Sequence, residues 1–351
     1  MKDIDVAALK PGMTLAKTVI NQDFIVLLLA NTVLNDKHIS ILKNMKISRV
    51  CVKDEFDMSK LYQQVVALKN KDSSFNRGFE KLNKMAKKIF DEVRQGGEIK
   101  SPVILLVARI LPMADDAGSI NYLFNLGHMN NTLAQHCLRV AIFAGIMAKW
   151  MELEWSDIRT IVTAAFLHDV GKFKFPPTFL HRTVDDFQGT ELQLYKTHCQ
   201  IGRNMVRDYK FEEPIPTAVY QHHEFMNGSG FPSGIRGKDT HLFAKIIAAA
   251  DAYDALISER PGHVKKTPFD AINLFAKSQF SRLDPHVCVP FVTRIKDHLI
   301  GSHVTLKDGR KGTVIFYPKD FASLPVVRLE DGTQVNLNQQ RDISIVQYSI
   351  T

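Results

Sequence analysis

The chain has 351 residues, of which 45% are hydrophobic and 23% are charged, and it contains four cysteines. This composition is typical of globular proteins, and the length allows two or three domains with a substantial core. The cysteines lie far apart and form no CxxC pair, which argues against a disulfide framework or a thiolate zinc site. No apolar run approaches the roughly 18 residues of a membrane-spanning helix. Because the N-terminus also has no apolar signal segment, we expect a cytoplasmic protein.

The formal net charge is +8, from 45 basic and 37 acidic residues. Two interpretations fit this charge: an ordinary basic surface, or a site for an anionic ligand. The basic residues form no block with interleaved aromatic residues, so we expect no long nucleic acid as a partner. A small phosphorylated ligand needs only a few local cations, so the total charge does not decide between the two interpretations.

Hydrophobic periodicity divides the chain into four parts. Residues 1–70 are predicted to form a small domain of short strands with one helix over DKHISILKNMK. Residues 71–100 contain an amphipathic connecting helix, FEKLNKMAKKIFDEV, that ends at Gly96-Gly97. Helical periods dominate residues 101–298, and alternating runs interrupted by Asp-Gly predict an antiparallel β module over residues 299–351. The predicted fold is multidomain and mainly α: an all-helical bundle flanked by a small N-terminal α/β or β-rich domain and a small C-terminal β module.

Polar residues stand beside the buried face of one predicted helix and at the end of another in the central part. His136 lies beside a buried helix face, where a lone histidine is usually a satisfied core residue. The apolar run AAFLHDVGKF ends in His168-Asp169, and a buried carboxylate there costs several kcal/mol unless a cation such as a divalent metal ion compensates it. The alternative is a simple helix stop in which Asp169 pairs with Lys172.

Three further positions extend this set. His198 follows the run LQLYKT and, taken alone, reads as a surface residue. His222 and His223 precede the glycine-rich stretch EFMNGSGFP, and paired imidazoles need a hydrogen bond, a proton or a metal when they are buried. Asp251 and Asp254 are three residues apart among alanines, so they share one face of a helix.

Together these imidazoles and carboxylates form a nitrogen and oxygen ligand set without sulfur. Such a set suits Fe, Mn or similar divalent ions better than a structural zinc ion. A carboxylate beside a histidine ligand can bridge two ions, and a two-metal site activates water for an in-line displacement at phosphorus. We therefore expect two divalent metal ions, most simply Fe or Mn.

Five motifs follow one another between residues 120 and 298: HCLRVA, FLHDVGK, ELQLYKTHCQIG, HHEFMNGSGFP and ADAYDALISERP. Their order resembles the HD superfamily of metal-dependent phosphohydrolases, and more narrowly the HD-GYP cyclic di-GMP phosphodiesterases of bacteria. Residues 9–52 are similar, more loosely, to a domain often found ahead of this module. The resemblance implies catalytic roles for Asp169, as a bridging ligand, and for Lys172, and it places Lys172, Asp254 and Arg260 around the substrate. The implied metal ligands are His136, His168, Asp169, His198, His222, His223 and Asp251.

The sequence departs from the family pattern at several positions. Phe231 stands at the family's tyrosine position, which keeps a stacking surface but loses the hydroxyl. Thr132 stands where some members have a glutamate associated with a third metal, so we expect two metals, with His223 either a ligand or a neighbour of the ligands. The run PGHVK lacks an expected aromatic residue and cation, for which His263 and Lys265 are candidate substitutes.

The resemblance implies an enzyme that hydrolyses cyclic di-GMP to pGpG, or onward to GMP, through a hydroxide activated by two metals. Two alternatives stay open: a catalytically weak cyclic dinucleotide receptor or scaffold that acts through its terminal domains, or a hydrolase of another cyclic dinucleotide. The complete ligand set favours catalysis, whereas the altered residues after Arg260 favour the receptor. The expected partners are cyclic di-GMP and either a second copy of the chain or a signalling protein, with no membrane contact.

Overall fold

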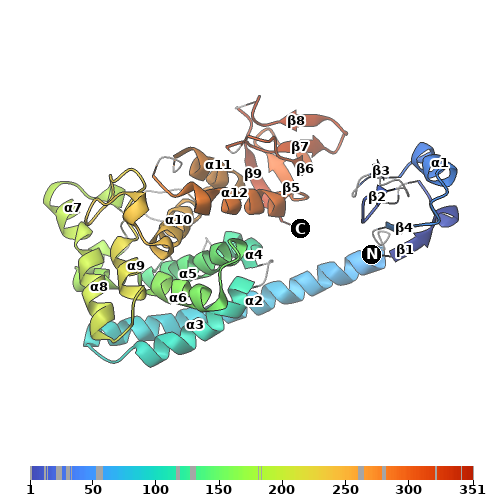
Figure 1. Cartoon of the computed structure of the whole chain (residues 1–351). Coiled ribbons are helices and arrows are strands. Elements are labelled where there is room, and N and C mark those ends of the chain that lie inside the picture. Colours follow the sequence, from blue (N-terminus) through green and yellow to red (C-terminus); the bar gives the residue numbers. More distant parts are fainter. Residues whose placement is uncertain are drawn as a thin grey trace. The chain divides into compact units, whose positions relative to one another are not determined.

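The chain divides into two compact units, Met1–Asp72 and Ser73–Thr351, which are coloured along the sequence in Figure 1. The structure is a computed structural model. It describes residues 2–11, 13, 15–20, 26–28, 32, 34–52, 58–115, 119–126, 132–180, 182, 184–259, 265–278, 282–320, 322–340 and 342–350. For residues 2, 20, 26, 58–74, 115, 121, 122, 125, 126 and 278 it describes the backbone alone.

The first unit combines two strand pairs with short helices. Strand β1 (Lys2–Asp5) pairs antiparallel with β4 (Arg49–Val52), and β2 (Val19–Ile20) pairs with β3 (Val26–Leu28). The 3-10 helix η1 (Val6–Ala8) follows β1, and α1 (Asp36–Asn44) covers the predicted helical stretch. The side chain of Asn35 caps α1 by accepting from the N–H of His38. The core of this unit is Val6, Leu9, Leu15, Val19, Leu34, Ile39, Leu42, Val50 and Val52.

Helix α2 (Met58–Gln95) is longer than its sequence pattern predicts. The polar stretch KNKDSSFNRG, expected to precede the helix, is itself helical. It contains no proline, its lysine and arginine residues have good helix propensity, and its least favourable residue, Gly78, costs only about 1 kcal/mol. The helix ends at Gln95 as expected, because Gly96 takes the left-handed conformation with φ of +75°.

The second unit is mainly helical, as predicted. Helix α5 (Leu133–Trp150) is buried along almost its whole length and packs against α3, α6, α10 and α12, which is why its sequence is apolar on nearly every side. None of the described helices is both long and apolar enough to cross a membrane. The other α-helices are α3 (Lys100–Asp115), α4 (Ser119–Leu126), α6 (Trp155–Leu167), α7 (Gly189–Lys196), α8 (His198–Asp208), α9 (Ile215–Gln221), α10 (Leu242–Ile257), α11 (Pro268–Ser278) and α12 (Pro285–Leu299). Short 3-10 helices are η2 (Val170–Lys174), η3 (Pro177–Phe179), η4 (Val184–Asp186) and η5 (Gly237–Asp239).

The chain ends in an antiparallel sheet with the strand order β8-β7-β6-β5-β9 (Figure 1). Gly309 and Gly332, in the two Asp-Gly turns, have φ of +89° and +86°, a conformation that glycine adopts without steric cost. One face of the sheet shares a continuous hydrophobic core with α11 and α12, and Tyr348 meets Phe269 edge to face. The strands are β5 (His303–Leu306), β6 (Lys311–Phe316), β7 (Val326–Leu329), β8 (Gln334–Asn336) and β9 (Ile345–Ser349).

Candidate metal centre

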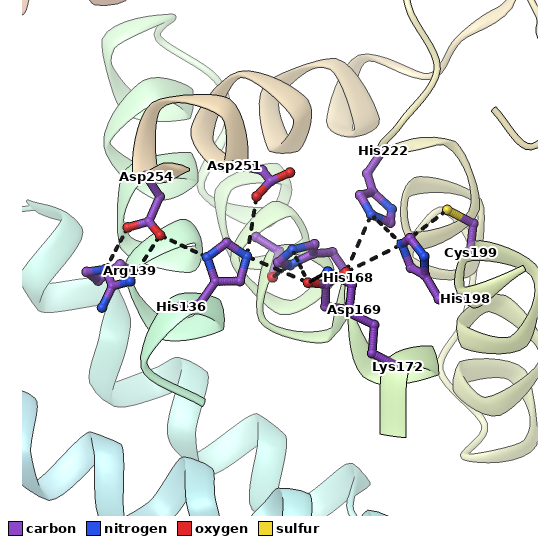
Figure 2. Close-up of polar contacts among 11 residues, drawn as sticks. His136, Arg139, His168, Asp169, Lys172, His198, Cys199, His222, Asp251 and Asp254 are labelled. Carbon is purple, nitrogen blue, oxygen red and sulfur yellow. Dashed lines mark hydrogen bonds and ion pairs between the residues drawn. The ribbon is translucent and has the colours of Figure 1, made fainter. Parts of the chain in front are cut away.

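The seven residues implied as metal ligands lie on three α-helices or directly after the ends of two others, and they come together in the second unit. Figure 2 shows the side chains of those that it labels pointing toward one another from α5, α8, α10 and the ends of α6 and α9. Their candidate ligand atoms form two groups, and within each group all atoms lie within 4.8 Å of one another. One group is Asp169, His198, His222 and His223, and the other is His136, His168 and Asp251.

Asp169 lies between the two groups and turns one carboxylate oxygen toward each. Its Oδ1 is 3.4 Å from Nε2 of His198 and 3.9 Å from Nε2 of His222. Its Oδ2 is 3.4 Å from Nε2 of His168 and 3.7 Å from Nε2 of His136. A carboxylate can bridge two ions by offering one oxygen to each of two ligand sets, and Asp169 has this arrangement.

Backbone hydrogen bonds fix the orientation of three histidines. Nδ1 of His168, His198 and His222 lies 2.7, 2.6 and 2.7 Å from the carbonyl oxygen three residues earlier in the chain. A carbonyl can only accept, so this hydrogen bonding assigns the proton to Nδ1 and leaves the Nε2 lone pair directed into the site. This is how proteins commonly prepare an imidazole for a metal ion.

The donor atoms are arranged so that they need positive charge. Nε2 of His198 and Nε2 of His222 are 3.3 Å apart, and burial lowers the pKa of both imidazoles well below its usual value, which keeps them neutral. Two lone pairs that face each other repel unless a cation lies beside them. Nε2 of His168 and His223 and Oδ1 of Asp169 are buried and have no hydrogen-bond partner among the described residues. The residues of both groups therefore fit divalent ions.

His136 is held from behind by Asp254, which in turn is held by Arg139. Nδ1 of His136 is 2.8 Å from Oδ2 of Asp254, and Nε2 faces Oδ1 of Asp251 at 3.3 Å. Burial favours the neutral imidazole, but hydrogen bonds and charge from Asp251 and Asp254 outweigh it and raise the pKa of His136 to about 9. Arg139 donates from Nε to Oδ1 of Asp254 at 2.6 Å and from Nη2 to Oδ2 at 3.1 Å. Asp254 therefore orients His136, in addition to lining the cavity beside the metal centre.

Lys172 pairs with the carboxylate at the middle of the site. Its Nζ is 2.6 Å from Oδ2 of Asp169 and lies 4.9 Å from the centre of the Tyr195 ring. Burial acts to lower the pKa of Lys172, but the charge of Asp169 outweighs it, so the pKa is raised and the ammonium keeps its proton. The ion pair considered as an alternative to metal binding is thus present, and a cation at Oδ2 would compete with it.

A close approach of two backbone segments brings His198 to Asp169. A Cβ atom at Gly171 would lie 2.1 Å from the carbonyl oxygen of His198 and 2.7 Å from the amide nitrogen of Gly202. Only glycine therefore lets η2 pack this tightly on α8. His198, which reads as a surface residue when taken alone, is fully buried by this contact. The glycine of the HDVGK motif thus serves the ligand geometry.

Glu224 closes the loop that follows the paired histidines. Its carboxylate accepts from the backbone N–H groups of Ser233, Gly234 and Ile235 at 2.6, 3.1 and 3.1 Å. Phe231, at the family's tyrosine position, lies over the ring of His223 with centroids 4.5 Å apart. The aromatic ring is therefore used to pack His223.

The other predicted positions fall outside the two groups. Arg260 and His263 lie outside the described residues. Nζ of Lys265 donates to the carbonyl of Phe124 at 2.7 Å, so it does not replace the missing cation in the cavity. Thr132 caps α5 by accepting from the N–H of Gln135, and the Gln135 side chain accepts from the N–H of Thr132 in return.

A cavity of about 270 Å³ adjoins both groups. Three arginines that the sequence motifs do not identify also belong to this region: Arg139 behind Asp254, and Arg182 and Arg282 in the cavity wall. For Arg139 a signal existed, since it stands one helical turn after His136 on α5. The cavity is lined by Thr132, Leu133, His136, Asp169, Lys172, Leu180, Arg182, Val184, Asp185, Tyr195, His222, His223, Phe225, Ala248, Asp251, Ala252, Asp254, Ala255, Leu256 and Arg282.

Comparison with known proteins shows which domains and enzymes this chain is similar to. The family model of the HD domain matches residues 124–287. Cyclic di-GMP phosphodiesterase PA4108 of Pseudomonas aeruginosa is 30% identical over 181 residues, which are 51% of this chain and 43% of that protein. The 3′3′-cGAMP-specific phosphodiesterase 3 of Vibrio cholerae is 26% identical over 152 residues, covering 43% of this chain and 33% of that protein. The chain thus spans less than half the length of either relative.

A solved structure shares the fold over most of the chain. The HDG"Y"P protein Bd1817 of Bdellovibrio bacteriovorus superposes with a TM-score of 0.53 at 18% identity, covering 84% of this chain and 98% of that one. The helical part of this chain therefore matches the HD domain over residues 124–287, and it is similar to a cyclic di-GMP phosphodiesterase.

Proposed function

We propose that this protein is a metal-dependent phosphodiesterase that hydrolyses cyclic di-GMP to pGpG. The observation that carries the proposal is the position of Asp169, whose two oxygens face two separate groups of histidine and aspartate ligands. The adjoining cavity supplies cations for an anionic substrate, and a relative of this chain is named as a cyclic di-GMP phosphodiesterase.

We further propose that the two groups hold two divalent ions, Fe or Mn, because their donors are imidazole nitrogens and carboxylate oxygens. Such ions, when bound, activate the attacking water and stabilise charge on the phosphate oxygens. Asp169 would bridge them. The other ligands would be His198, His222 and His223 on one side and His136, His168 and Asp251 on the other.

The protein's own residues have distinct tasks in this reaction. Lys172 holds its proton in a buried position beside Asp169, so it can donate to a phosphate oxygen or to the leaving 3′-oxygen as negative charge develops. Asp254 keeps the Nε2 atom of His136 aimed at the site through its contact with Nδ1. Arg260 is a second proposed phosphate contact.

A second substrate is supported by the comparisons. A relative from Vibrio cholerae is named as specific for 3′3′-cGAMP, so we propose that molecule as the alternative cyclic dinucleotide.

The terminal modules are the proposed contact surfaces for a second copy of the chain or a signalling protein. Light scattering after size-exclusion chromatography checks the first of these partners.

Product analysis tests the proposed activity. Protein purified without oxygen and assayed for Fe and Mn is incubated separately with cyclic di-GMP and 3′3′-cGAMP, and products are separated by anion exchange. We expect pGpG from cyclic di-GMP and no product with Asp169→Asn. If the metal-loaded protein bound cyclic di-GMP without hydrolysing it, the receptor alternative would replace the enzyme.

A further inference from the structure

Three described lysine and arginine side chains line the cavity, and they differ in what already neutralises them. Lys172 is paired with Asp169 at 2.6 Å. Arg182 is 3.2 Å from a carboxylate oxygen of Glu191 and also donates to the carbonyl of Asp186. Among the described residues, no carboxylate lies within salt-bridge distance of Arg282. This arginine therefore brings a positive charge to the cavity that is still available to a ligand.

Arg282 is held in place by the loop that carries His223. Its carbonyl oxygen accepts from the N–H of Met226 at 2.8 Å, which ties its backbone three residues from that histidine. Its guanidinium carbon lies 4.0 Å from the centre of the Phe225 ring. A guanidinium that rests on an aromatic face is positioned without using its N–H donors. The side chain is thus oriented while its hydrogen-bonding capacity is kept.

The acidic residue nearest in sequence does not neutralise this arginine. Asp284 is 2.9 Å from Nζ of Lys245, and its other oxygen accepts from the N–H of His286 at the start of α12. Lys245 therefore compensates the charge of Asp284. The local pairing leaves Arg282 to face the cavity with its charge intact.

The proposed substrate has one more negatively charged phosphate than the metal centre can bind. A cyclic dinucleotide carries two phosphodiester groups, and only one of them can occupy the reacting position between the ligand groups. The second phosphate also has a negative charge, and desolvating it in a cavity requires a cation. Arginine suits this task because its planar fork can bind two phosphate oxygens at once.

We propose that Arg282 binds the phosphate that is not cleaved and so makes the site selective for cyclic dinucleotides over simple phosphodiesters. This role rests on the proposed function, because it assigns one phosphate to the metal centre. It also supplies a cation that Lys265 does not provide, since Lys265 is engaged with the carbonyl of Phe124.

The test compares two substrates in the metal-loaded protein. Arg282→Met is expected to raise KM for cyclic di-GMP about tenfold or more, the scale of a lost charge-assisted hydrogen bond, with kcat changed less than about twofold. Bis(p-nitrophenyl) phosphate has a single phosphodiester, so its kcat/KM should stay the same. Arg282→Lys, which keeps the charge but not the fork, should recover part of the loss.

The matched control is Arg94→Met. Arg94 also lies over an aromatic ring, with its guanidinium carbon 4.9 Å from the centre of Phe173, but it is not part of the cavity wall. This variant should leave KM for cyclic di-GMP unchanged. An equal loss in Arg94→Met, or an equal loss with bis(p-nitrophenyl) phosphate, would overturn the assignment.

Binding to metal-stripped protein separates this proposal from the proposed activity. Calorimetry with cyclic di-GMP and cyclic di-AMP should show the same fold loss of affinity for both ligands in Arg282→Met. A loss confined to cyclic di-GMP would assign Arg282 to the guanine base, and no binding by the wild-type protein would reject the phosphate site. If neither substrate were turned over by metal-loaded protein, the enzyme proposal would fail while this comparison still decided the role of Arg282.

Discussion

Nδ1 of His136 lies 2.8 Å from Oδ2 of Asp254, although the two residues are 118 positions apart and belong to different helices. The contact links a candidate metal ligand on α5 to a carboxylate on α10 that Arg139 holds from the other side. The orientation of one imidazole therefore depends on a fully buried ion pair, and this dependence can be tested directly.

Asp254→Asn should lower the free energy of unfolding and should weaken metal binding by the ligand group that contains His136. The variant keeps the side-chain shape but leaves the buried guanidinium of Arg139 without its counter-charge, which costs about 3 kcal/mol of unfolding free energy. Denaturant titration measures that loss, and mass spectrometry of the metals should show a lower content. Asp91→Asn removes a surface ion pair with Arg94 and should cost less than about 1 kcal/mol. Unchanged stability in Asp254→Asn would contradict the buried pairing.

Asp169→Ala should remove both metal ions from the purified protein, because one carboxylate serves both ligand groups. Asp185→Ala is the matched control, since Asp185 lines the same cavity but belongs to neither group. Elemental analysis at equal protein concentration distinguishes the two variants. Retention of a full metal complement by Asp169→Ala would show that Asp169 does not bridge.

Gly171→Ala should lower stability and metal content together. The added Cβ would lie 2.1 Å from the carbonyl of His198, so η2 and α8 must separate, at a cost of about 1–3 kcal/mol or more. Gly78→Ala is a control with the opposite sign: Gly78 lies within α2, its added Cβ meets nothing closer than 4.0 Å, and the change should stabilise by about 1 kcal/mol. Equal melting temperatures for wild type and Gly171→Ala would refute the close approach.

Four site histidines should make the metal-free protein's stability depend on pH. Their combined contribution to the free energy of unfolding should be largest near pH 6.5. Burial lowers the pKa of His198, His222 and His223, the last to about 4, so these residues stabilise the fold above the ordinary histidine pKa and this stability is lost as the pH falls below 6.5. His136 acts in the opposite direction. Its pKa is raised to about 9, so its contribution is complete below pH 6.5 and is lost as the pH rises toward 9.

Unfolding free energies at intervals from pH 4 to 9, in the presence of a chelator, check this dependence. Each lowered histidine contributes a slope of up to about 1.4 kcal/mol per pH unit on the acid side. His223→Gln should reduce the slope of unfolding free energy below pH 6.5 by the share of one histidine. The slope above pH 6.5 should not change. A slope that stayed the same in His223→Gln would mean that His223 takes up a proton in the folded protein.

The sequence predicts the mainly helical class and most element positions because hydrophobic periodicity survives in local windows. It does not predict the start of α2, because the polar stretch before Phe79 carries no apolar stripe and yet has adequate helix propensity. The expectation of a surface position for His198 is wrong for a related reason. Its burial depends on η2 packing on α8, a contact between segments that is invisible to a local pattern.

The order of the motifs is enough to predict the candidate ligands. It does not predict how those ligands divide into two groups in space. Which oxygen of Asp169 faces which histidine depends on how α5, α6, α8 and α9 pack, and spacing along the chain does not encode that. The sequence motifs do not identify Arg282, because it follows the last recognisable motif. Its position beside the cavity depends on contacts with Phe225 and Met226 in a distant loop. Glu224 stands inside a recognised motif, but its bonds to three backbone amides become apparent only when the loop is folded.

The core shared by the terminal sheet and helices α11 and α12 also affects how shortened versions of this protein should be interpreted. Tyr253, next to Asp254 on α10, packs edge to face against Phe275 of α11 and Phe291 of α12. Cutting the chain after α12 would strip the cover from those two helices, and the disturbance would reach the acidic face of α10. Loss of activity in such a truncation would therefore report on folding, and point changes on the outer strands are the better way to ask whether the sheet carries a signal.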